Sequence, residues 1–108
     1  MSNLELLRET SRLISKDLFD NDEFHPDAPD YSSLKNILAV RITELLKTNL
    51  NELLRILYRI DIAEHKLKNA FKCMSEEEIA DQIAILVIER QMQKVEFRRK
   101  YSNNNGEV

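Results

Sequence analysis

Hydrophobic residues recur at steps of three and four along most of the chain, the spacing that places side chains on one face of an α-helix. The first such run predicts a helix from Ser2 or Asn3 to Asp20, and the second predicts a helix that begins between Tyr31 and Ser33. The positions that define the two helical faces are Leu4, Leu7, Ser11, Ile14 and Leu18 in the first helix, and Leu34, Ile37, Leu38, Arg41, Ile42 and Leu45 in the second.

Polar residues that favour helix starts divide this pattern into separate helices. Residues 21–30 contain both prolines of the chain and predict a loop, after which Asp30, Ser32 or Ser33 can cap the second helix. Asn49 followed by Glu52, and Ser75 followed by Glu78, both match the capping box, in which side chains and backbone N–H groups pair reciprocally. A third helix is therefore expected to begin at Leu50, and the last helix at Ser75.

The chain around Asp61 allows two interpretations. Asp61 and Glu64 have the spacing of another capping box, which would begin a new helix. The apolar positions nevertheless continue across this point without interruption, at Ile56, Ile60, Ala63, Leu67, Ala70 and Met74. We favour a break or kink at Asp61, because the apolar face moves there by roughly a third of a turn.

Glycine is almost absent, with its single occurrence at Gly106. Without glycine the backbone has no low-cost way to adopt the positive φ angles of tight hairpins and phosphate-binding loops. The sequence therefore predicts an all-α fold, a compact bundle of four to five helices with a long C-terminal helix. We expect a single domain over residues 1–101 and a flexible C-terminal tail at 102–108, after the last helix has ended near Tyr101.

The last helix carries apolar residues on two opposite sides. One side, expected to face the core of its own bundle, consists of Ile79, Ile83, Leu86, Val87, Phe97 and Tyr101, interrupted by Arg90 and Lys94. The other is a seam of Ile85, Ile88, Met92 and Val95. This seam predicts a protein interface, with a homodimer as its simplest closed form, or a helical protein partner. The alternative is a central helix that its neighbours surround.

The distribution of charge bears on nucleic-acid binding. The net charge is −3, and the acidic first third of the chain can neutralise the basic middle third, which argues against a large free basic surface. The alternative function is nucleic-acid association through Arg98, Arg99 and Lys100, beside Phe97 and Tyr101. Basic residues at a helix C-terminus are, however, expected from the helix dipole alone.

Sequence motifs for catalysis and metal binding are not found. There is no Glu-x-x-His pair, His65 is expected to point outward, and the acidic loop around His25 lacks the glycine that a calcium loop requires. Cys73 has partly apolar surroundings, which favour a structural role, and one glycine cannot build a nucleotide-binding loop. The sequence therefore predicts a protein that is not an enzyme and that uses no cofactor or metal.

The same sequence predicts a cytoplasmic location without membrane contact. The longest apolar run, residues 83–88, is far shorter than a membrane span, and neither a secretory signal nor a second cysteine is present. Two segments, LRILYRIDIAE at 54–64 and ILVIERQMQKV at 85–95, resemble a group of short all-helical bacterial proteins, with similarity over about residues 35–101. This resemblance implies a bacterial cytoplasmic origin and no particular activity.

Overall fold

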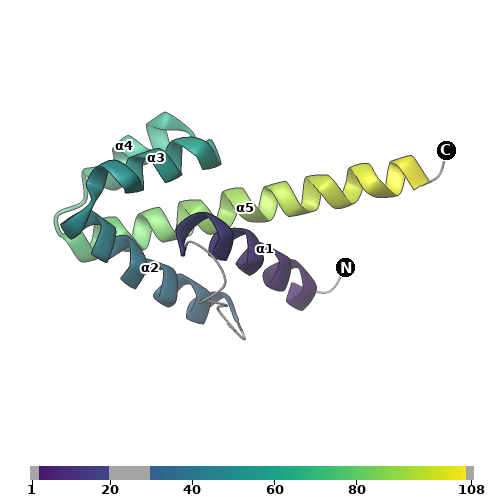
Figure 1. The fold of residues 1–108 in the computed structure, drawn as a ribbon, viewed down its shortest axis with the longest axis horizontal. Coiled ribbons are helices and arrows are strands. Elements are labelled where there is room, and N and C mark those ends of the chain that lie inside the picture. The colour runs from purple at the N-terminus through teal and green to yellow at the C-terminus, as the bar shows by residue number, and fades with distance from the viewer. Residues whose placement is uncertain (1–2, 20–29, 107–108) are drawn as a thin grey trace.

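The computed structural model describes residues 3–19 and 30–106, and within these ranges every regular element is an α-helix (Figure 1). The all-α prediction is confirmed. The loop predicted at 21–30 lies outside the described residues except for Asp30, as do Ser2 and His25. The helices are α1 (Asn3–Leu18), α2 (Tyr31–Thr48), α3 (Leu50–Ile60), α4 (Glu64–Phe71) and α5 (Glu76–Gly106).

Helix α1 ends two residues earlier than the sequence predicts, at Leu18 instead of Asp20. A side chain of α2 satisfies the carbonyl group of the last residue of α1: Arg41 Nε donates a hydrogen bond to the Leu18 carbonyl oxygen at 2.9 Å. Most of the predicted inner face is buried, but Leu4 is exposed, so the buried face starts at Leu7. Helix α1 therefore packs through its middle and its C-terminal half.

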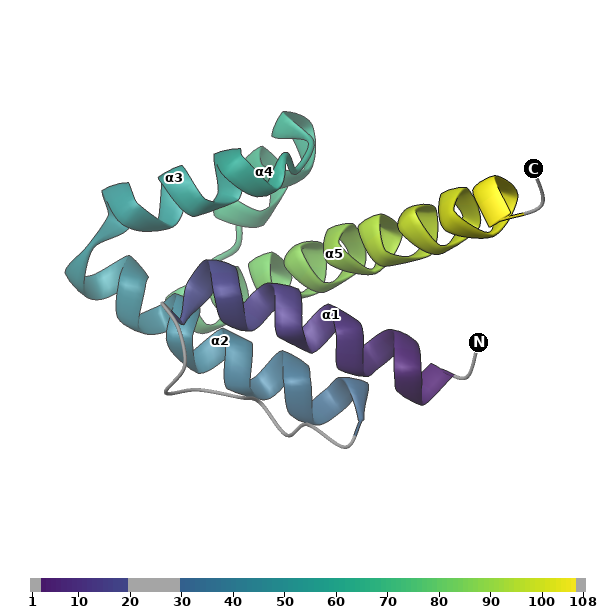
Figure 2. The ribbon, with the colours of Figure 1, turned by 45° about the vertical axis from the view of Figure 1, so that its right-hand side comes forward.

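Helices α2 and α3 begin at residues that the sequence identifies as caps. The Asp30 carboxylate accepts a hydrogen bond from the Ser33 backbone N–H at 2.8 Å, and the Asn49 side chain accepts one from the Glu52 N–H at 3.2 Å. Asp30 is therefore the cap among the three candidates for α2, and the predicted start of α3 at Leu50 is confirmed. Figure 2 shows the sharp turn between α2 and α3 at Asn49, which brings α3 to the opposite side of α5 from most of α1 and α2.

The predicted break at Asp61 is confirmed, although its mechanism differs from a capping box. Asp61 ends α3 in the left-handed region (φ 68°, ψ 52°), and its backbone N–H bonds to the Leu57 and Tyr58 carbonyl oxygens. The residue before α4 is Ala63, which provides no side-chain cap, so the predicted box between Asp61 and Glu64 is wrong. A left-handed residue closes α3 because it turns the chain away and satisfies the last carbonyls.

Helix α5 starts where the third capping pattern places it and ends later than the sequence predicts. Ser75 Oγ accepts a hydrogen bond from the Glu78 N–H at 3.1 Å, and the Glu78 carboxylate accepts one from the Met74 N–H. The helix then continues through Gly106, so residues 102–106 are helical where the sequence predicts a tail. Asparagine lowers helix stability by only a fraction of a kcal/mol per residue, about 0.7 at most, and so need not end a helix.

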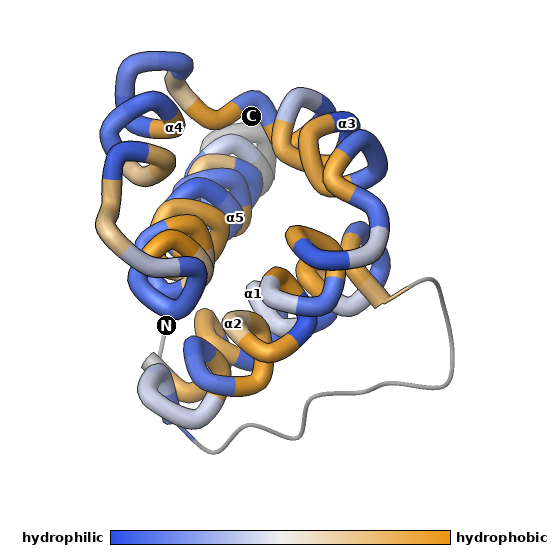
Figure 3. The backbone as a smooth tube through the Cα atoms, turned by 90° about the vertical axis from the view of Figure 1, so that its left-hand side faces the viewer, coloured by the Kyte–Doolittle hydropathy of each residue, from blue (hydrophilic) through white to orange (hydrophobic). Residues whose placement is uncertain are grey.

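Helix α5 packs against the other four helices: α1 and α2 lie along one side of it (Figure 1), and α3 and α4 lie above it and flank it when it is viewed along its length (Figure 3). Arg90 of α5 pairs with Asp61 at the end of α3, whereas Gln91, one residue later and about 100° around the helix, bonds to Asp17 of α1. Two sides of α5 are therefore covered within a single chain. This is the central-helix arrangement that the sequence analysis gives as the alternative to an exposed seam.

Candidate interaction site

The predicted interface seam lies largely inside the chain. Ile88 is fully buried and Val95 is 3% exposed, while Ile85 and Met92 are half-buried. The expectation that this seam is free for a partner is therefore wrong for Ile88 and Val95. The physical reason is the layer of α1 and α2, which covers the side of α5 where Ile88, Gln91 and Val95 follow one another at steps of three and four.

The opposite apolar side of α5 is covered over only part of its length. Ile79, Ile83, Leu86 and Val87 are buried or half-buried, as predicted for a core face. Phe97 and Tyr101 continue the same side but are 63% and 58% exposed, so their assignment to the core is wrong. Figures 1 and 2 show why: α5 extends well beyond the ends of α3 and α4.

The two exposed rings lie against each other. The ring centroids of Phe97 and Tyr101 are 5.0 Å apart with an interplanar angle of 44°, a tilted arrangement typical of favourable aromatic pairs. Lys94 and Arg98 lie beside them on the same side of the helix, with Lys94 half-buried and Arg98 exposed. We call these four residues, Lys94, Phe97, Arg98 and Tyr101, the distal stripe.

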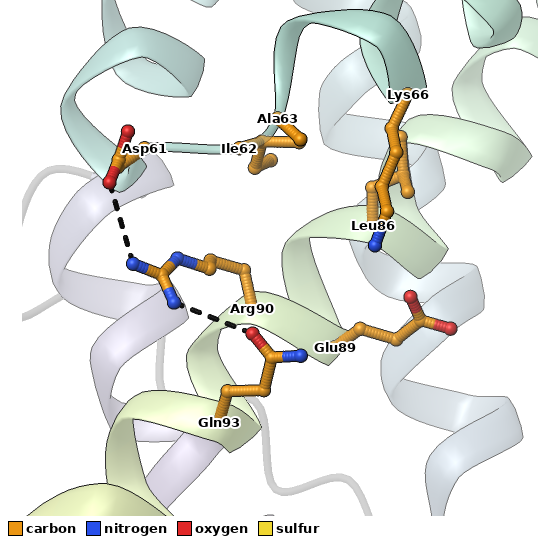
Figure 4. Close-up of a pocket in the computed structure, with 8 residues that line it drawn as sticks. All are labelled: Asp61, Ile62, Ala63, Lys66, Leu86, Glu89, Arg90 and Gln93. Carbon is orange, nitrogen blue, oxygen red and sulfur yellow. Dashed lines mark hydrogen bonds and ion pairs between the residues drawn. The ribbon is translucent and has the colours of Figure 1, made fainter.

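A pocket of about 150 Å³ lies on this side of α5, at the junction of α3 and α4 (Figure 4). Arg90 crosses it: one guanidinium nitrogen lies 3.5 Å from Asp61 Oδ2, and another donates to Gln93 Oε1 at 3.4 Å. The other lining residues are Ile62, Ala63, Lys66, Leu86 and Glu89. The pocket holds both acidic and basic side chains and adjoins the start of the distal stripe.

The environment of Lys94, close to apolar surface, disfavours its positive charge. Burial, together with the neighbouring Arg90, lowers the pKa of Lys94, while Asp17 and Asp61 act in the opposite direction. Lys94 is thus partly withdrawn from water between the ends of α1 and α3. A carboxylate brought to this position would offset that cost, because it favours the charged form of the lysine.

The residues of the nucleic-acid alternative do not act as one group. Arg98 and Lys100 are exposed, but Arg99 lies on the α1 side of α5 and pairs with Glu9 at 2.8 Å and with Glu5 at 3.6 Å. The hydrogen bond from Arg99 lowers the pKa of Glu9 and raises that of Arg99 itself. Arg99 is therefore engaged in holding α5 to α1.

The described part of the chain contains no group of three or more histidine, cysteine or carboxylate side chains placed to hold a metal ion. His65 is exposed on α4, in agreement with its predicted orientation, and Cys73 is a half-buried free thiol. None of the helices in the described ranges has the length and apolar character that crossing a bilayer requires.

Comparison with protein-family models, with curated proteins and with solved structures finds no match for this chain. The structure therefore identifies the distal stripe as one exposed surface, whereas the sequence analysis assigns Phe97 and Tyr101 to the core face and names Arg98 only for the nucleic-acid alternative. A signal for it is present in the sequence: Arg90 and Lys94 interrupt the apolar side of α5 at the point where its intramolecular cover ends.

Proposed function

We propose that the protein is a small non-enzymatic helical adaptor, which binds another protein through the distal stripe. The observation that carries this proposal is the exposed aromatic pair of Phe97 and Tyr101, on the side of α5 that other helices cover closer to its start. Exposed apolar surface that continues a buried face is typical of contact sites.

The two exposed rings can make a large contribution to binding. Aromatic side chains carry about 150–250 Å² of surface each, and burial of apolar surface contributes about 25 cal/mol per Å². Burying the exposed parts of both rings would therefore contribute on the order of 4–8 kcal/mol, before the costs of association. Aromatic residues of this kind often dominate the binding energy of an interface.

A homodimer through the same surface is less favourable than an adaptor. Two copies that paired their distal stripes would bring Lys94 and Arg98 of one chain close to the same residues of the other. Like charges placed together across an interface oppose association. We therefore expect a monomer in solution, as measured by light scattering at increasing protein concentration.

Selection from a library of displayed helical peptides tests the proposal. The wild-type protein should enrich peptides that no longer bind the double variant Phe97→Ser/Tyr101→Ser, whereas Tyr58→Ser, which alters an aromatic residue of α3 that is 88% exposed, should retain binding. Enrichment that is insensitive to the double variant, or no enrichment at all, would overturn the proposal. A dimer that the double variant dissociates would replace the adaptor with a homodimer.

A further inference from the structure

We infer that the partner segment is an acidic amphipathic helix, which lies along the distal stripe where α3 ends. This inference rests on the proposed function and adds the chemical class of the partner. It follows from three observations: the contact between Asp61 and Arg90, the row of basic residues that continues along α5 beyond this contact, and the length of the exposed side of α5.

The contact between Asp61 and Arg90 shows how an element that covers this side of α5 meets it. The Asp61 carboxylate, at the C-terminal end of α3, lies 3.5 Å from the Arg90 guanidinium. Ile62 and Leu86 line the same pocket as this ion pair, so apolar and ionic groups occur together there (Figure 4). The chain then turns back into α4, which packs over the earlier part of α5, and the side of α5 that carries Phe97 and Tyr101 stays exposed.

The basic residues continue in register beyond this contact. Arg90, Lys94 and Arg98 are spaced by four residues and form a row along α5, next to the aromatic pair. Neither Lys94 nor Arg98 has a carboxylate within 4.0 Å among the side chains that the structure describes. Two positive charges thus flank exposed aromatic surface, and acidic residues on a partner would complement them as Asp61 complements Arg90.

The shape of the exposed side suits a helix. From Lys94 to Tyr101 the distal stripe rises about 10 Å along a straight helix, or two turns, with a rise of 1.5 Å per residue. A helical partner of similar length can place apolar residues at positions i, i+3, i+4 and i+7 against Phe97 and Tyr101. Its acidic residues would then face Lys94 and Arg98.

Nucleic acid fits the surface less well than an acidic protein helix. The exposed Glu89 and Glu96 lie along one edge of this side of α5, and the whole chain carries a net charge of −3. A phosphate backbone brings a continuous line of negative charge, which these carboxylates would repel. A helix can instead present its acids only where Lys94 and Arg98 lie.

The test uses the full-length protein and two designed peptides of about 15 residues, each stapled because short helices are marginal in water. Both peptides carry the same apolar face, and they differ only in having glutamate or lysine at the flanking positions. Binding of each is measured by fluorescence anisotropy to the wild type, to Lys94→Glu/Arg98→Glu and to the matched control Lys68→Glu/Lys72→Glu, an exposed pair with the same spacing at the end of α4.

The glutamate peptide should bind the wild type and the α4 control at least about tenfold more tightly than the lysine peptide, a preference that added salt should weaken. The Lys94→Glu/Arg98→Glu variant should reverse this preference. Equal affinity for both peptides, or no reversal in the variant, would overturn the inference while leaving the adaptor proposal intact, since the apolar contact would then be sufficient. If neither peptide binds but the library selection still depends on Phe97 and Tyr101, the inference of an acidic helical partner would be overturned and the adaptor proposal would stand.

Two further probes identify the competing ligands. An oligothymidine strand and vesicles that contain an anionic lipid are added to the same protein and variants. Binding of either probe that is lost in Lys94→Glu/Arg98→Glu, without binding of the glutamate peptide, would overturn the inference in favour of nucleic acid or membrane.

Discussion

The Gln91 side chain of α5 donates a hydrogen bond of 2.6 Å to the Asp17 carboxylate of α1, and Gln91 itself is 1% exposed. This contact joins residues 74 positions apart in the chain and lies between the buried residues Ile88 and Val95. Gln91 Oε1 is buried and has no hydrogen-bond partner among the described residues. The two atoms of one amide therefore have opposite effects on stability.

Substitutions at the two ends of this hydrogen bond should lower the free energy of unfolding by different amounts. Asp17→Ala leaves the buried Gln91 amide N–H group without its acceptor and is expected to lower the free energy of unfolding by about 1–3 kcal/mol. Gln91→Leu removes both polar atoms of the amide from the interior and keeps a similar side-chain volume. It should therefore lower the free energy of unfolding by less. Urea unfolding followed by circular dichroism measures both values, and a larger loss for Gln91→Leu would contradict this account.

The free energy of unfolding should depend on the backbone preference of the residue that replaces Asp61. Its φ of 68° is accessible to glycine and asparagine but unfavourable for a β-branched residue. We expect Asp61→Val to lower the free energy of unfolding by about 1–2 kcal/mol, and Asp61→Gly to change it little. Both variants lose the exposed ion pair with Arg90, so the difference between them reports the backbone alone. Equal effects in urea unfolding would argue against strain at this residue.

The burial of the seam predicts opposite results for two charge substitutions on α5. Ile88→Asp places a charge in the core and should unfold the protein or lower its stability by more than about 4 kcal/mol. Phe97→Asp changes an exposed residue and should leave stability within about 0.5–1 kcal/mol of the wild type. Circular dichroism during thermal unfolding compares the two. An Ile88→Asp protein as stable as the wild type would show that this position is at the surface.

The ion pair between Glu9 and Arg99 predicts a dependence on pH. Arg99 holds the pKa of Glu9 below its ordinary value of 4.5, so the folded state binds the proton at this group less readily than the unfolded state. The stabilisation is therefore complete above about pH 4.5 and is lost as the pH falls below it, through the lower folded pKa. Removal of Arg99 should bring the folded pKa back toward 4.5.

Carboxyl chemical shifts of Glu9, followed by NMR during an acid titration, measure this effect in the wild type and in Arg99→Gln. The wild-type midpoint should lie at lower pH than that of the variant, and the separation should decrease with added salt because the pair is at the surface. Identical midpoints would show that Arg99 and Glu9 are not paired in solution.

The amino-acid sequence by itself determined where helices begin and break, because these signals act over a few residues. Asp30, Asn49 and Ser75 each accept a hydrogen bond from the backbone N–H group three positions later, so local chemistry was sufficient to locate them. The break at Asp61 was also predictable from the shift of the apolar face. Its left-handed closure of α3 was not, because the same residues match a capping box.

Only the tertiary structure decided which parts of α5 are covered. The spacing of apolar residues identifies two apolar sides of this helix, but it does not show which parts of each side the neighbouring helices cover. The layer of α1 and α2 covers one side of α5 and buries Ile88 and Val95. The early end of α3 at Asp61 leaves Phe97 and Tyr101 exposed. Burial depends on contacts between distant segments, and a local pattern contains no information about where those segments end.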